Sequence, residues 1–320
     1  MELLTLSHLA DSGMPARKIR ADVESGALER VRPGLYVEGK EWARVSPESR
    51  HLILMDAARL AAHGAEPVYG CISAAAAWGL PVFRADASHV HMVTPRSSYR
   101  HSVADVVRHR GDPSEGVTRV GRFLCTSLAR TVFDVIREQT PEASISCADA
   151  ALRRVSWDPS TRRCDRAAAD SLRLEVMSLV DENPGARGIR QARRVIACAQ
   201  PAAQLPGESI SRLYLSRLGF ALPRLQVRVP APSGRDYEMD FAFDALRTFG
   251  EFDGVHKYSD ARFLRGRTPE QALLDEKRRE DWVRGTTQWR IVRWEMSHIR
   301  SAHTLATRLA HFGITPPGRR

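Results

Sequence analysis

Carboxylates inside two short aromatic segments constrain the C-terminal part of this chain. The first segment reads Met239-Asp240-Phe241-Ala242-Phe243, and the second reads Gly250-Glu251-Phe252-Asp253-Gly254. Alternating apolar residues on either side of a short turn are typical of a β-hairpin. A carboxylate placed in such a strand is costly unless something binds it. Oxygen ligands of this kind suit a hard divalent cation such as Mg2+.

Strand alternation predicts which side chains of this hairpin share a face. Asp240 is expected to point away from an apolar face formed by Tyr237, Met239, Phe241 and Phe243. If the strands pair through a turn near residues 244–247, Asp240 lies across from Glu251 or Asp253. Paired carboxylates raise each other's pKa unless a cation lies between them. The alternative is an edge hairpin whose polar face is only hydrated.

The segments around the hairpin predict further helices and strands. Pro206 opens an amphipathic stretch that ends at Gly219, with Glu208 in its first turn. A second helix is expected from Pro269 to Gly285, because proline suits a first turn and glycine suits a helix end. Strands are expected at 225–229 and 288–296. The predicted order is helix, three strands, helix and strand.

This order and its charged residues resemble the PD-(D/E)XK nuclease superfamily, and most of all its very-short-patch-repair-like endonuclease branch. The residues that carry the resemblance are Glu208, Asp240, Glu251-Phe252-Asp253-Gly254, Lys257-Tyr258 and the run Glu276-Lys277-Arg278-Arg279-Glu280-Asp281. The resemblance covers residues 201–320. It implies a restriction-endonuclease-like mixed sheet flanked by helices.

The resemblance also implies roles for individual residues. Asp240 and Glu251 would be ligands of Mg2+ or Mn2+, and Glu208 would be the acid on the preceding helix. The carbonyl group of Phe252 would add a ligand. The implied reaction is hydrolysis of a DNA phosphodiester, with the cation orienting a water and stabilising charge on the phosphate.

The sequence departs from the family pattern at one position. Asp253 stands where the family usually has a lysine. Lys257 or Lys277 would then supply the positive charge, and Asp253 would be a further metal ligand. The alternative is a decayed domain that does not cut DNA. His256 lies near a histidine position of the very-short-patch branch, although a loop histidine of this kind is more often only solvated.

Residues 1–40 form a separate block that predicts a winged helix-turn-helix. Two short helical segments end at Gly13 and Gly26, and a hairpin then turns at Pro33-Gly34. We expect the second helix and the wing to contact DNA through Arg17, Lys18, Arg20, Arg30 and Arg32. The alternative is a small helical cap with a hydrated basic face.

This block resembles the N-terminal domain of AbiEi-type antitoxins of type IV toxin–antitoxin systems, through Gly13-Met14 and Arg32-Pro33-Gly34-Leu35-Tyr36. A weaker resemblance continues through residues 41–200, at 72–81, 89–93 and 126–134, and implies an α/β middle region. The resemblance implies a DNA-binding repressor whose partners are DNA and a cognate toxin.

Composition agrees with a polyanionic partner. The 320 residues carry a formal net charge of +10, which favours nucleic acid as a partner, although free use of arginine is an alternative. No apolar run approaches the roughly 20 residues of a membrane span. The five cysteines have no Cys-x-x-Cys spacing, which argues against a zinc site or a disulfide framework and favours a reduced cytoplasm.

The sequence favours two functions, of which one is enzymatic and the other is not. The first is a DNA-binding protein with a Mg2+-dependent endonuclease domain in a multidomain α+β chain. The second is a non-catalytic, antitoxin-like repressor that keeps a degenerate nuclease fold. A hydrolase set of Ser73, His91 and Asp134 is disfavoured because no Gly-x-Ser-x-Gly elbow accompanies it.

Overall fold

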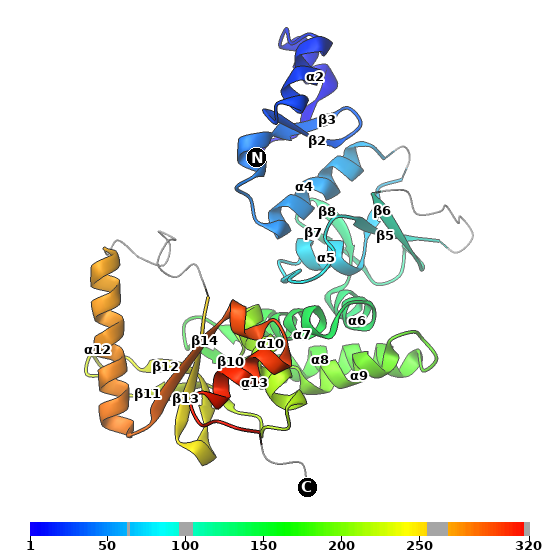
Figure 1. Ribbon diagram of the computed structural model, residues 1–320. Helices are drawn as coiled ribbons and strands as arrows, with labels where there is room; N and C mark the ends of the chain where they lie inside the picture. Colours follow the sequence, from blue (N-terminus) through cyan, green and yellow to red (C-terminus); the bar gives the residue numbers. More distant parts are fainter. Residues whose placement is uncertain (63–64, 96–104, 255–267, 317–320) are drawn as a thin grey trace. The chain divides into compact units, whose positions relative to one another are not determined.

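The computed structural model describes residues 1–62, 65–95, 105–254 and 268–316 (Figure 1). Helices and several mixed sheets form a multidomain α+β chain, as the sequence predicts. The N-terminal unit comprises Met1–Cys147 and Ser171–Ala197, and the C-terminal unit comprises Ala148–Asp170 and Cys198–Arg320. Lys257 and His256 lie outside the described residues.

The first forty residues contain the two helices and the hairpin that the sequence predicts. The elements are β1 (Leu4–Thr5), α1 (Leu6–Asp11), α2 (Ala16–Glu24), β2 (Leu28–Arg32) and β3 (Leu35–Glu38), and the sheet order is β1-β3-β2. Gly34 turns the hairpin with φ 75°, a conformation that glycine adopts without steric cost. Leu9, Ile19, Leu28 and Tyr36 form the buried cluster that joins the helices to the hairpin.

A five-stranded sheet of order β6-β5-β4-β8-β7 forms the centre of the N-terminal unit. Its strands are β4 (Val68–Tyr69), β5 (Val90–Thr94), β6 (Val106–Arg110), β7 (Val117–Val120) and β8 (Phe123–Thr126). The helices that follow and precede them are α3 (Gly39–Trp42), α4 (Pro47–Leu60), α5 (Cys71–Ala77), α6 (Leu128–Glu138), α7 (Pro141–Ser156), α8 (Arg166–Glu182) and α9 (Ile189–Cys198). Met55, Tyr69 and Phe123 are among the buried residues of its core.

A four-stranded sheet of order β11-β12-β13-β14 forms the C-terminal unit. Its strands are β11 (Arg224–Val229), β12 (Tyr237–Phe243), β13 (Thr248–Asp253) and β14 (Arg290–Glu295). The first three run antiparallel, and β14 is parallel to β13. Parallel neighbours need a crossover, and α12 (Pro269–Thr287) lies in that connection. The remaining elements are β9 (Trp157–Asp158), β10 (Arg163–Cys164), α10 (Pro206–Arg217), η1 (Asp244–Leu246), η2 (Met296–Ile299) and α13 (Ala302–Ala310).

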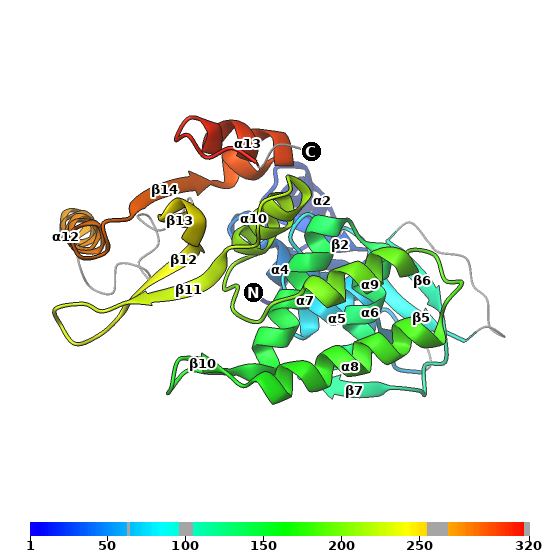
Figure 2. The same cartoon turned by 90° about the horizontal axis from the view of Figure 1, so that it is seen from below.

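Helices cover the two faces of this sheet, with α12 on one side and α10 and α13 on the other (Figures 1 and 2). On the α12 face, Val283 packs with Met239, Ala242, Phe249 and Ile291. On the α10 face, the buried Trp294 donates a hydrogen bond of 2.8 Å to the hydroxyl of Ser211. The sequence places the end of α12 at Gly285, but the helix continues to Thr287, where Gln288 ends it with φ 57°.

The predicted alternation along β12 is wrong, because the strand reverses its facing at Asp240. Met239 belongs to the cluster on the α12 face. Phe241 instead packs against Trp294, with ring centroids 5.2 Å apart. The register pairs Leu225 with Phe241 and Val227 with Met239, which places Gln226 opposite Asp240. Gln226 has a left-handed backbone of φ 49°, so the irregularity lies at this point of the pair.

Candidate functional site

Asp240 lies just beyond the last backbone pair of β12 and β13, at the open end of the hairpin. Backbone pairing between these strands runs from Phe243 to Phe241 on one side and from Thr248 to Gly250 on the other. Beyond Gly250, the backbone N–H of Phe252 donates to Asp240 Oδ2 at 2.8 Å. The carboxylate of Asp240 is therefore held by a backbone donor at the open end of the hairpin.

Glu208 is the second carboxylate of this site. It lies in the first turn of α10 and is only 3% exposed. Its Oε2 accepts hydrogen bonds from the backbone N–H of Gln204 at 2.9 Å and from Gln226 Nε2 at 3.2 Å. Burial, followed by the negative charge of Asp240, raises the pKa of Glu208 to about 8. Glu208 is therefore mostly protonated at neutral pH unless a cation compensates the pair.

Gln226 joins the two carboxylates, and the sequence predictions did not include it. Its Nε2 lies 3.2 Å from Glu208 Oε2 and 3.4 Å from Asp240 Oδ1. Its Oε1 accepts a hydrogen bond of 2.8 Å from Gln204 Nε2. A left-handed backbone in a residue other than glycine is a strained conformation that often marks a functional position. A polar residue between Leu225 and Val227 is the weak signal that could have identified it.

Glu251 lies in a different environment from Asp240, although the sequence predicts that they share one site. Glu251 is buried, and its Oε2 accepts a hydrogen bond of 2.9 Å from Arg293 Nε. Its Oε1 pairs with the guanidinium group of Arg279. Burial opposes ionisation of Glu251, but the charges of Arg279 and Arg293 outweigh it and lower the pKa. The charge of Glu251 is thus compensated by two arginines.

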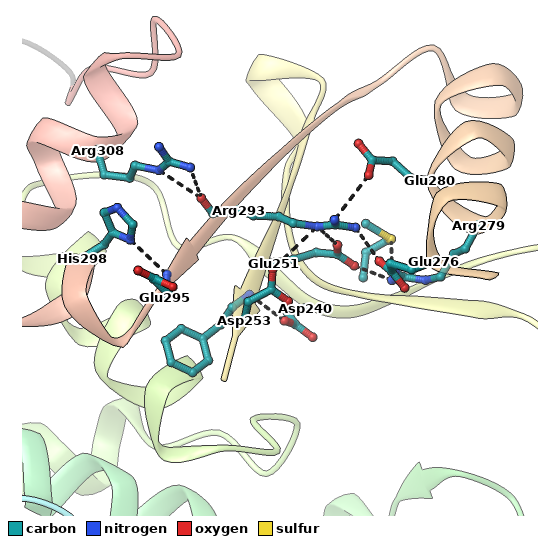
Figure 3. Close-up of polar contacts among 12 residues, drawn as sticks. Asp240, Glu251, Asp253, Glu276, Arg279, Glu280, Arg293, Glu295, His298 and Arg308 are labelled. Carbon is teal, nitrogen blue, oxygen red and sulfur yellow. Dashed lines mark hydrogen bonds and ion pairs between the residues drawn. The ribbon is translucent and has the colours of Figure 1, made fainter. Parts of the chain in front are cut away.

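Further acids surround these two arginines (Figure 3). Arg279 Nη1 lies 2.8 Å from Glu276 Oε1, and Arg293 Nη1 lies 3.3 Å from Glu280 Oε2. Glu276, Arg279 and Glu280 share one face of α12 because they are three and four residues apart. We call Glu251, Glu276, Arg279, Glu280 and Arg293 the arginine cluster. Lys277, predicted to supply a catalytic charge, is exposed on α12.

Asp253 ends β13 and is 39% exposed at its side chain, with Oδ2 3.9 Å from Arg293 Nε. It therefore lies at the edge of the arginine cluster. The structure brings Glu208 and Asp240 together through Gln226, and it places Glu251 in the arginine cluster. Phe252 connects the two groups, since it follows Glu251 and its N–H binds Asp240.

The Glu208–Asp240 site fits a hard cation better than the arginine cluster does. It offers the carboxylate oxygens of Glu208 and Asp240, which are ligands that Mg2+ accepts. Two adjacent carboxylates, one of them buried, are stabilised by a divalent cation that replaces the proton on Glu208. Glu251 already has two cationic partners, so a further cation there would have to displace an arginine.

The predicted DNA contacts differ in their surroundings. Arg17, Lys18 and Arg20 are exposed on α2, and Arg30 is exposed on β2. Lys18 pairs with Asp22 at 2.5 Å. Arg32 is only 12% exposed at its side chain and pairs with Asp105 at 2.7 Å. Arg32 is therefore largely buried against a carboxylate, whereas the other four side chains are exposed and, of these, Lys18 also has a carboxylate partner.

No family model matches this chain. It is similar to two uncharacterized proteins of Mycobacterium tuberculosis, MT2308 of strain CDC 1551 and Rv2248 of strain H37Rv. Each is 28% identical to it over 257 residues, which is 80% of this chain and 84% of the relative. Among the residues that the structure describes, no helix is long and apolar enough to cross a membrane.

Proposed function

We propose that residues 201–320 form a PD-(D/E)XK-type endonuclease domain that hydrolyses DNA phosphodiesters with Mg2+ or Mn2+. The observation that carries the proposal is the buried Glu208 carboxyl beside Asp240, with one amide nitrogen of Gln226 within 3.4 Å of both. Such a pair is typical of sites where a cation compensates two acids. The order helix, antiparallel strands, crossover helix and parallel strand supports the same proposal.

Asp240 and Glu208 would hold the cation, and the Phe252 carbonyl group would be a further ligand. When bound, the cation would activate a water and stabilise charge on the phosphate. The Phe252 N–H orients the Asp240 carboxylate, because it fixes Oδ2. Gln226 contacts both acids through Nε2, and Glu208 would release its proton if an ion bound.

The roles of the remaining predicted site residues change in this proposal. Glu251 positions β13 through the arginine cluster instead of holding the ion. Asp253, at the end of β13, stays a candidate further ligand. The positive charge near the phosphate is assigned to Lys257 or Lys277, of which Lys257 lies outside the described residues.

The N-terminal block would bring the nuclease domain to DNA. A winged helix-turn-helix places its second helix in the major groove and its hairpin on the backbone. Arg17, Lys18, Arg20 and Arg30 are exposed on α2 and β2, the elements that would make these contacts. Tethering would raise the effective concentration of the nuclease domain at DNA that the first domain holds. The net charge of +10 supports a polyanionic partner.

A non-catalytic repressor with a cognate toxin as partner is the second candidate, and two observations favour it. Both oxygens of Glu251 are engaged by arginines, and Asp253 stands at the usual lysine position. A domain in this state would keep the fold and the DNA-binding block without cutting. It would bind an operator sequence upstream of its own gene.

The two candidates are separated by a cleavage assay. The full chain is incubated with supercoiled, nicked, mismatched and branched DNA and with RNA, in Mg2+, in Mn2+ and in a chelator. The proposal expects metal-dependent cleavage of at least one DNA, with at least ~100-fold loss in Asp240→Asn, as expected when an interaction made in the transition state is removed. Asp244→Asn is the matched control, because Asp244 is exposed in the same hairpin. If wild type, Asp240→Asn and Asp244→Asn all show the same metal-independent background cleavage, the endonuclease proposal fails and the repressor remains as the candidate.

A further inference from the structure

Three potential metal ligands lie close together in the N-terminal unit, and in the sequence they are far from Glu208 and Asp240. The Sγ of Cys71 and one ring nitrogen each of His91 and His109 all lie within 4.8 Å of one another. Cys71 is the first residue of α5, His91 lies on β5 and His109 lies on β6. Neighbouring parallel strands carry the two histidines, since Val93 pairs with His109 in the register.

The two imidazole rings face each other through their nitrogens. His91 Nδ1 lies 2.8 Å from His109 Nε2, and the rings are stacked with centroids 5.0 Å apart. Two ring nitrogens at this distance share one hydrogen. The same two nitrogens can instead direct their lone pairs at one ion, provided that this hydrogen leaves. Cys71 Sγ lies beside them, with Gln139 Nε2 at 3.8 Å.

Glu138 occupies the position that an outer-shell carboxylate takes in many metal sites. Its Oε2 lies 3.1 Å from Nδ1 of His109, so it fixes the ring with Nε2 turned toward His91. A histidine that binds a metal through one nitrogen usually donates its other N–H to a carboxylate or carbonyl group. Glu138 is at the C-terminal end of α6, and its negative charge also favours a cation in this cluster.

We propose that Cys71 Sγ, His91 Nδ1 and His109 Nε2 bind a Zn2+-class transition-metal ion, with water or a small ligand in the fourth position. One thiolate and two imidazoles suit zinc and its neighbours, whereas Mg2+ prefers oxygen. Bond lengths of about 2.3 Å to sulfur and about 2.0 Å to nitrogen place tetrahedral ligand atoms roughly 3.3 to 3.7 Å apart. The two histidine nitrogens would separate by about 0.5 Å from their present 2.8 Å.

Ion binding changes the protonation of the cluster in a defined way. The metal–sulfur bond forms as the thiol proton of Cys71 leaves to solvent. The metal–nitrogen bonds form as the hydrogen between His91 and His109 leaves or moves to the far nitrogen of its own ring. The oxidation state of the metal does not change, so the step needs no further reactant. Cys71 and His91 are buried, and His109 and Glu138 are the partly exposed members.

The alternative is a hydrogen-bonded histidine pair beside an inert core cysteine. Ser73 lies nearby, but it does not act as a hydrolase nucleophile. Its Oγ accepts a hydrogen bond of 2.8 Å from the backbone N–H of His91 and lies 2.8 Å from His51 Nε2, inside the core. Asp134, the third member of that predicted set, is paired with Arg130. The Ser73 hydroxyl therefore engages the backbone of His91, whereas His91 Nδ1 faces His109.

The test is Co2+ titration of the metal-free, tag-free full chain, followed by absorbance. The proposal expects a thiolate-to-cobalt charge-transfer band that saturates at one Co2+ per chain, together with intense tetrahedral d–d bands, and both are lost when Zn2+ displaces the ion. Cys71→Ser should remove the charge-transfer band, and Cys198→Ser, an exposed cysteine, should keep it. Glu138→Gln should weaken Co2+ binding by about 10- to 100-fold with the band unchanged.

Circular dichroism shows whether Cys71→Ser, at a buried position, still folds. If Cys71→Ser does not fold, His109→Asn tests the proposal instead. The His109 side chain is partly exposed, and its replacement keeps the sulfur ligand of Cys71. The expected result is a retained charge-transfer band, weaker d–d bands and at least tenfold weaker binding. Wild-type protein without the thiolate band at one equivalent of Co2+, or a His109→Asn titration identical to wild type, would overturn the proposal.

Discussion

Asp240 Oδ2 accepts a 2.8 Å hydrogen bond from the backbone N–H of Phe252, just beyond the last backbone pair of β12 and β13. This bond connects the two groups of acids in the C-terminal unit. On one side Asp240 meets Glu208 through Gln226, and on the other side Glu251 enters the arginine cluster.

The stability of the metal-free protein should fall as pH rises from about 5 to 8, in the part that depends on Glu208. Burial and the charge of Asp240 raise its folded-state pKa to about 8, above the unfolded value of 4.5. Between these values the folded state binds more protons, so deprotonation favours unfolding, by at most ~1.4 kcal/mol per pH unit. Urea unfolding across this range should show the slope in wild type. Glu208→Gln should flatten it, and an unchanged slope in the variant would contradict the assignment.

Removing the charge of Glu251 should destabilise the protein by about 2 to 3 kcal/mol, because Arg279 and Arg293 would each lose a partner in a partly buried position. Glu251→Gln is the variant, and the midpoint of urea unfolding is the measurement. Glu270→Gln serves as a control on the exposed start of α12, where the midpoint should stay close to that of wild type. Equal midpoints for the two variants would show that the arginine cluster contributes little.

Gly207→Ala should disturb the site through packing. A Cβ at position 207 would clash with the ring of Phe252, whose N–H orients Asp240. We expect a lower unfolding temperature and weaker Mg2+ binding. Gly285→Ala is the opposite control. A Cβ there meets no described atom within 4 Å apart from its chain neighbours and the adjacent helix backbone, and alanine stabilises a helix interior by up to about 1 kcal/mol relative to glycine. A Gly207→Ala protein as stable as wild type would argue against the close packing.

Arg17→Ala and Arg20→Ala should weaken DNA binding more than they change stability, because both side chains are exposed on α2. Each lost phosphate contact should reduce the slope of log affinity against log salt by about 1. Fluorescence anisotropy with a labelled duplex at several salt concentrations measures this slope. Arg32→Ala should instead lower stability, because the Arg32 side chain is largely buried and pairs with Asp105. DNA affinity that is unchanged in the α2 variants would contradict the predicted interface.

Local signals in the sequence predicted the elements of the C-terminal unit well. The helix expected from Pro206 is α10, which ends at Arg217 just before Gly219, and the predicted hairpin is β12 and β13. These signals depend on residues a few positions apart, namely proline in a first turn, glycine after a helix and alternating apolar side chains. They failed at Gly285, because Gln288 adopts the left-handed conformation that ends α12.

The partners of the acids could not be predicted in the same way. Glu251 binds Arg279 and Arg293, which lie 28 and 42 residues later in the chain. The reversal at Asp240 depends on Gln226 of the neighbouring strand, and alternation along β12 alone gives the opposite facing. Cys71 meets His91 and His109 only after three elements pack, so a search for Cys-x-x-Cys spacing could not find this cluster. Long-range packing decided each of these outcomes.

The central claim is that Glu208 and Asp240 share a Mg2+ ion that replaces the proton of Glu208. The most direct measurement is calorimetric titration of Mg2+ into the full chain at pH 7, in buffers of different ionisation enthalpy. With a Glu208 pKa of about 8, binding should release close to one proton per ion in wild type and none from this site in Glu208→Gln. Mg2+ binding without proton release, or with the same release in Glu208→Gln, would contradict it.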